Sequence, residues 1–134
     1  VEAVVAHAAR RWGDGDLALC GLDELARAAH VSREHLCRVF RAEVGCAPVE
    51  ALRLMRLERA GTLLARFELP IAEVARLAGF SDQFHFSRCF RTVYGCAPSA
   101  FRDRIRTGQP WPPVGPGGVR ALCRRLWEEL RAKR

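Results

Sequence analysis

The sequence predicts an all-α fold in which two similar helical subdomains are joined by a long helix. Residues 22–29 (LDELARAA) are matched by residues 71–78 (IAEVARLA), and in both copies a polar turn leads into a second helical stretch that ends in Phe-Arg. Both copies then close on Gly-Cys-Ala-Pro, at residues 45–48 and 95–98. A short helix, a turn and a longer helix, repeated within one chain, are typical of paired helix-turn-helix units.

The first helix-turn-helix subdomain is expected over residues 1–47. Apolar residues at helical spacing over residues 2–12 predict a helix that packs on the first copy. Residues 22–29 form the short helix, and Ser32 is placed to cap the longer helix, over residues 33–44. The core side of this longer helix carries Leu36, Val39 and Phe40, and its other face carries Glu34, Cys37, Arg38 and Arg41.

Residues 48–66 predict one linker helix, which opens with Pro48 at a permitted first-turn position. About 18 residues of helix span roughly 27 Å, so this rod can hold two units at a fixed distance. Its polar side is expected to carry Arg53, Arg56 and Arg59.

The second helix-turn-helix subdomain is expected over residues 67–107. Gly79 can take a positive φ at the turn, and Phe80 can fill the gap between the two helices. Either Asp82 or Ser81 is placed to cap the following helix, residues 83–94. A further short basic helix is expected over residues 99–106.

The chain is expected to end in a Pro/Gly-rich linker, residues 108–118, followed by a basic amphipathic helix, residues 119–134. The apolar stripe of that helix must be covered by something. Docking on the same chain, self-association and a nucleic-acid contact are the alternatives.

The composition favours a polyanionic partner, because 22 basic residues stand against 15 acidic ones and the net charge is +7. Genome composition explains the arginine richness equally well, so charge alone decides little. The six cysteines form no C-x-x-C pair, which favours reduced structural thiols, no metal site and a cytoplasmic location. No apolar run approaches the roughly 18 residues of a membrane span, so no membrane contact is expected.

Residues 71–102 (IAEVARLAGFSDQFHFSRCFRTVYGCAPSAFR) resemble the signature of AraC/XylS-type transcription regulators, and the likeness extends over about residues 1–106. The matching positions are Ile71, Ala75, Gly79, Phe80, Phe86, Ser87, Arg88, Phe90, Gly95, Pro98, Ser99, Phe101 and Arg102. The resemblance implies two helix-turn-helix units whose recognition helices enter successive major-groove segments on one face of the DNA duplex. DNA geometry requires the same arrangement: one face of B-DNA recurs about every 34 Å, so two reading helices must be spaced to match that repeat.

Carried over by position, the resemblance implies a set of DNA-binding residues on each recognition helix. The first helix presents Glu34, Cys37 and Arg38, with Arg33 and Arg41 near the phosphate backbone; the second presents Gln83, Phe84, His85 and Arg88, with Arg91 flanking.

The residue types suggest what each side chain reads. Arg38 and Arg88 suit guanine, and Gln83 suits adenine. His85 can donate to a base or a phosphate, whereas Phe84 can touch a thymine methyl or pack against the core. Glu34 and Cys37 are weak readers, so the first helix is expected to discriminate less than the second.

The resemblance therefore implies a sequence-specific, double-stranded DNA-binding transcription regulator that contacts RNA polymerase, activation being the more common outcome. No catalytic triad, carboxylate pair or nucleotide-binding glycine motif is present, so neither an enzyme nor a cofactor is expected. A DNA-repair-associated module is one alternative, but a Pro-Cys-His nucleophile and a four-cysteine zinc cluster are both absent. A protein-interaction module that has lost DNA binding is the other. The chain is expected to be part of a longer regulator or to be controlled by its abundance, because it leaves no room for a sensor domain.

Overall fold

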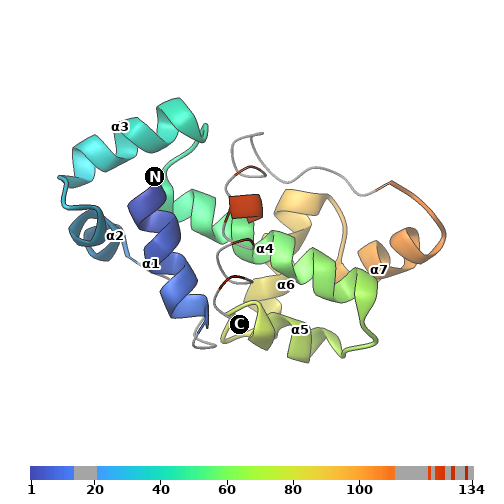
Figure 1. Cartoon of the computed structure of the whole chain (residues 1–134). Helices are drawn as coiled ribbons and strands as arrows, with labels where there is room; N and C mark the ends of the chain where they lie inside the picture. Colours follow the sequence, from blue (N-terminus) through green and yellow to red (C-terminus); the bar gives the residue numbers. More distant parts are fainter. Residues whose placement is uncertain (14–20, 111–120, 122, 126–127, 129–131, 133–134) are drawn as a thin grey trace. The chain divides into compact units, whose positions relative to one another are not determined.

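The computed structural model describes residues 1–13, 21–110, 121, 123–125, 128 and 132. Its helices are α1 (Glu2–Gly13), α2 (Leu22–Ala29), α3 (Arg33–Glu43), α4 (Pro48–Arg66), α5 (Ile71–Leu77), α6 (Gln83–Tyr94) and α7 (Pro98–Arg106) (Figure 1). No strand occurs within these described residues. The predicted all-α fold is therefore confirmed, and the predicted helix ends agree with the observed ones to about one residue.

The chain forms two compact units, and the division between them falls inside α4. Unit one contains Val1–Met55 together with Gly115–Arg134, and unit two contains Arg56–Val114.

The core of unit one is built from one face of each of its helices. Val4, Val5, Ala8 and Ala9 of α1 are buried, as are Leu25 of α2 and Leu36 and Phe40 of α3. Glu24 of α2 accepts hydrogen bonds from two α1 side chains, His7 at 2.7 Å and Arg11 at 3.4 Å. The prediction that α1 packs on the first copy is thus confirmed.

An aromatic cluster fills the core of unit two. The ring centroid of Phe90 lies 4.2 Å from that of Tyr94 and 5.3 Å from that of Phe101. The ring centroids of Phe86 and Phe80 are 5.3 Å apart. The hydroxyl of Tyr94 donates to the carbonyl of Leu57 at 3.3 Å, so α6 is bonded to α4 as well as packed in the core. Buried Phe80 occupies the predicted place at the turn.

The turns of the two copies have the same backbone construction. The amide of Val31 donates to the carbonyl of Ala26 at 3.1 Å, and at the equivalent positions the amide of Phe80 donates to the carbonyl of Ala75 at 2.9 Å. Each turn needs one residue with a positive φ: Gly79 has φ 86° in the second copy, as predicted, and His30 has φ 56° in the first.

The apolar stripe predicted for the C-terminal helix, formed by Val119, Leu122, Leu126, Trp127 and Leu130, lies outside the described residues, as does most of the Pro/Gly-rich linker. Of the described residues there, Cys123 is buried, and Arg125 donates to the Glu2 carboxylate of α1 at 3.1 Å. The hydrogen bond of Arg125 therefore connects the described part of this segment to α1 within unit one. Separately, none of the helices in the described part of the chain combines the length and apolar character that crossing a bilayer requires.

Candidate nucleic-acid interface

The second helix of each copy begins with a side-chain cap that fixes its first turn. The Ser32 hydroxyl accepts from the amide of His35 at 3.1 Å, and the Asp82 carboxylate accepts from the amide of Phe84 at 2.8 Å. Of the two capping candidates in the second copy, the structure selects Asp82. Both caps satisfy backbone donors that a helix start leaves open, so α3 and α6 hold their first side chains in defined positions.

The exposed face of α3 carries most of the residues predicted for it. Glu34, Arg38 and Arg41 are exposed and share one stripe, because they are spaced i, i+4 and i+7. Arg33 is also exposed, and its guanidinium lies 3.4 Å from the Asp23 carboxylate of α2. Cys37 is only half-buried, so its thiol is less accessible than its neighbours on this face.

The exposed face of α6 carries all of its predicted residues: Gln83, Phe84, His85, Arg88 and Arg91. Phe86 and Phe90 are fully buried on the other side. Helical geometry places Phe84, Arg88 and Arg91 in the middle of the exposed stripe, directly opposite these two phenylalanines. Phe84 is 73% exposed, so the alternative that it packs against the core is wrong.

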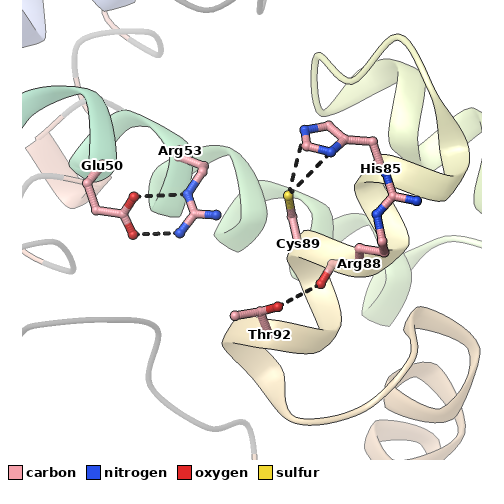
Figure 2. Close-up of polar contacts among 6 residues, drawn as sticks. All are labelled: Glu50, Arg53, His85, Arg88, Cys89 and Thr92. Atoms are coloured by element: carbon pink, nitrogen blue, oxygen red, sulfur yellow. Dashed lines mark hydrogen bonds and ion pairs between the residues drawn. The ribbon is translucent and has the colours of Figure 1, made fainter.

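His85 contacts a residue of its own helix. Its ring nitrogens lie 3.8 and 3.9 Å from the thiol of buried Cys89, one turn further along (Figure 2). The Phe80 ring is also near, with its centroid 5.8 Å from that of His85. Its ring therefore lies toward the turn, beside the central stripe of α6.

Arg56 of α4 was expected on a polar surface, and this expectation is wrong. The residue is only 3% exposed. Its Nε donates to the carbonyl of Ala78 at 3.1 Å, its Nη2 donates to the carbonyl of Gly79, and its guanidinium lies 4.6 Å from the centroid of the Phe80 ring. Arg56 thus fixes the turn that leads into α6, a role that the helical pattern of α4 gives no sign of.

Arg102 of α7 makes a similar connection at the other end of α4. Its guanidinium donates to the carbonyl of Leu64 at 3.2 Å and to that of Leu69 at 2.6 Å. Next to it, Arg106 forms an ion pair with Glu68, whose pKa is lowered chiefly by that hydrogen bond. These contacts make Arg102 a structural residue of unit two.

Five of the six cysteines lie among the described residues. Cys37, Cys46, Cys89 and Cys96 are free thiols, while Cys20 lies outside the described residues. Burial, with a smaller contribution from Glu50, raises the pKa of Cys46 and so favours the unreactive thiol form. Within the part of the chain that the structure describes, no group of side chains could hold a metal ion.

Two helix-turn-helix units, each exposing a capped second helix with outward arginines, define a double helix-turn-helix domain of the nucleic-acid-binding class. The family described as "Helix-turn-helix domain" matches residues 25–104, which is more than half of the chain. The chain belongs to this family, and specifically to its AraC-type members, as the resemblance implied. This is a family of DNA-binding transcription regulators and not of enzymes, which confirms the expectation that the chain is not an enzyme.

Similar proteins include curated regulators and solved DNA-binding domains. The chain is 40% identical over 89 residues to the HTH-type transcriptional regulator GbdR of Pseudomonas aeruginosa, a match that covers 66% of this chain and 24% of the relative. It is 32% identical over 89 residues to the RCS-specific HTH-type transcriptional activator RclR of Escherichia coli, covering 66% of this chain and 31% of that one. The chain therefore spans about a quarter to a third of the length of these two relatives.

Among solved structures, the DNA-binding domain of the transcriptional factor AdpA in complex with a target DNA has a TM-score of 0.67 at 31% identity. The match covers 80% of this chain and 95% of that domain. An AraC-type regulator from Chromobacterium violaceum has a TM-score of 0.66 at 26% identity, with 82% and 96% covered.

Proposed function

We propose that the chain is the sequence-specific, double-stranded DNA-binding part of a transcription regulator, with α3 and α6 as recognition helices in successive major-groove segments. The observation that carries this proposal is the repeated stripe of exposed side chains, Glu34, Arg38 and Arg41 on α3 and Phe84, Arg88 and Arg91 on α6. Each stripe lies opposite a buried core and begins at a capped helix start. The solved relative with its target DNA supports the same use of the fold.

Each exposed residue has a proposed task. Arg38 and Arg88 donate twice to guanine O6 and N7, and Gln83 pairs with adenine. Arg33, Arg41 and Arg91 contact phosphates, and His85 donates to a base or a phosphate. Glu34 and half-buried Cys37 add little, so α6 carries more of the sequence discrimination than α3.

The domain layout follows from these roles. Residues 1–47 and 67–107 each form a reading subdomain, and residues 48–66 set their spacing. We infer that the regulator acts in the cytoplasm, as an activator that contacts RNA polymerase at the promoter. Residues 119–134 are the segment through which self-association would occur.

Selection of bound sequences from a random duplex pool tests the proposal. We expect enrichment of a defined motif, and an affinity for it that falls steeply with salt, because each neutralised phosphate releases condensed counterions. No enrichment, together with an affinity that is flat between 50 and 200 mM salt, would favour the protein-interaction module instead.

A further inference from the structure

Phe84 is an apolar side chain at the centre of an otherwise polar reading face. It is 73% exposed, and on the same stripe Arg88 and Arg91 follow at i+4 and i+7. The backbone amide of Phe84 donates a hydrogen bond to the Asp82 carboxylate at 2.8 Å. This bond fixes the backbone position from which the Phe84 side chain projects.

The duplication provides an internal comparison for this residue. Arg88 and Arg91 of α6 correspond to Arg38 and Arg41 of α3, so the two stripes share their arginines. At the position of Phe84, α3 carries the acidic Glu34. The two stripes therefore differ in chemistry one turn before the proposed guanine-reading arginine.

The major groove offers one apolar group on its base edges, the C5 methyl of thymine. An aromatic ring placed against any other base edge would remove hydrogen-bonding groups of the base from water without offering them a new partner. Such unsatisfied polar groups cost binding free energy. An exposed phenylalanine on a recognition helix thus matches a methylated pyrimidine. Glu34, by contrast, can accept from the amino group of cytosine.

We propose that Phe84 recognises the C5 methyl group of a pyrimidine in the half-site read by α6. The inference rests on the proposed function and adds a ligand chemistry to it: thymine and 5-methylcytosine are accepted at this position, and unmodified cytosine is disfavoured. Four residues of helix advance about 6 Å, so the methyl group lies within about two base steps of the guanine read by Arg88.

The test uses the full chain and the duplex motif recovered by selection. Each thymine of the α6 half-site is replaced in turn by deoxyuridine, which removes the methyl group and keeps the Watson–Crick edge. We expect one such replacement to weaken binding about three- to fivefold, the factor that corresponds to one buried methyl group. When a cytosine is placed at that position, methylation of its C5 should likewise increase the binding affinity about three- to fivefold.

Two variants test whether Phe84 causes the difference in affinity between thymine and deoxyuridine. With Phe84→Ala, thymine and deoxyuridine should bind equally at that position. With Glu34→Ala, the equivalent change on α3, the difference should persist. Because Phe84 and Glu34 are both exposed, both variants are expected to keep the thermal stability of the parent, which a melting curve checks.

The possible failures are distinguishable. Equal binding of thymine and deoxyuridine at every position, with Arg88→Ala still relaxing a guanine preference, would overturn the inference and leave the proposed function standing. A methyl effect that survives Phe84→Ala would overturn it too. Absence of any specific duplex binding would overturn both proposals.

Discussion

At the scale of single residues, Arg56 is a buried charge that connects α4 to the turn before α6. Its guanidinium is buried, yet two backbone carbonyls and the face of the Phe80 ring surround it. A buried charge with such partners is tolerated, whereas carbonyls that lose a charged donor are left unsatisfied.

Replacing Arg56 by methionine should therefore destabilise unit two. We expect a loss of about 1.5–3 kcal/mol, the range for hydrogen bonds to charged groups. Urea unfolding measures it, and Arg66→Met, an exposed residue of the same helix, is the control and should change stability little. Equal effects of the two changes would show that the Arg56 contacts contribute nothing specific.

Arg88 is one of the two arginines to which we assign guanine recognition in the proposed interface. Arg88→Ala should cost about 1–3 kcal/mol on the preferred duplex and relax one base position. Titration against a panel of single-base variants measures both effects. Arg76→Ala removes the same charge from α5, where the guanidinium pairs with Glu73, and should leave the base preference intact. Unaltered preference in Arg88→Ala would refute the assigned role.

Residues differ in how far the sequence predicts them. Phe86, Phe90 and the exposed arginines of α6 follow from helical periodicity alone. Arg56 does not, because its partner Ala78 lies 22 residues away, and the pattern of one helix carries no information about such a contact. Periodicity also places Phe84 on the outer face, but its residue type leaves open whether the ring turns back against the core, and the 73% exposure decides this.

At the scale of elements, the caps and turns are the features that local chemistry predicts best. Ser32 and Asp82 are small polar residues directly before a helical run, and both accept the expected backbone amide. Exposed Ser81 is an equally good sequence candidate, and the choice between it and Asp82 depends on where the helix starts.

Asp82→Ala should destabilise α6 by about 0.5–2 kcal/mol, the usual effect of losing an N-terminal cap. Asp82→Asn keeps an acceptor oxygen and should recover most of the loss. Thermal unfolding of the three proteins measures the difference. Unchanged stability in Asp82→Ala would mean that Ser81 replaces the cap.

The two turns allow a reciprocal test at equivalent positions. His30 has a positive φ of 56°, a conformation that costs a side chain about 1–2 kcal/mol. His30→Gly should therefore stabilise unit one by about 0.5–1 kcal/mol, after the greater unfolded-state entropy of glycine is subtracted.

Gly79→Ala is the matching change in unit two and should destabilise it by about 1–2 kcal/mol, since Gly79 has φ 86°. Denaturant midpoints measure both effects. The same sign for the two changes would contradict the assignment of equivalent turns. Only the Gly79 turn is predictable in advance, because histidine at a left-handed position gives no local signal.

At the scale of the whole molecule, α4 is the element on which the proposal depends. It is one helix of 19 residues, about 28 Å long, and it contributes residues to both compact units. The sequence predicts the length of this helix and the duplication around it. Its connections to the surrounding elements come from Arg56, Tyr94 and Arg102, whose partners are tertiary and are not predictable from spacing.

The most direct test of the central claim is the effect of half-site spacing on affinity. The duplex motif is recovered by selection, and base pairs are then inserted between the positions relaxed by Arg38→Ala and by Arg88→Ala. If α3 and α6 read successive major-groove segments, the two variants relax positions about 10 base pairs apart, and inserting five base pairs reduces the affinity to that of a single half-site. Relaxation of the same position by both variants, or an affinity unaffected by the insertion, would contradict the claim.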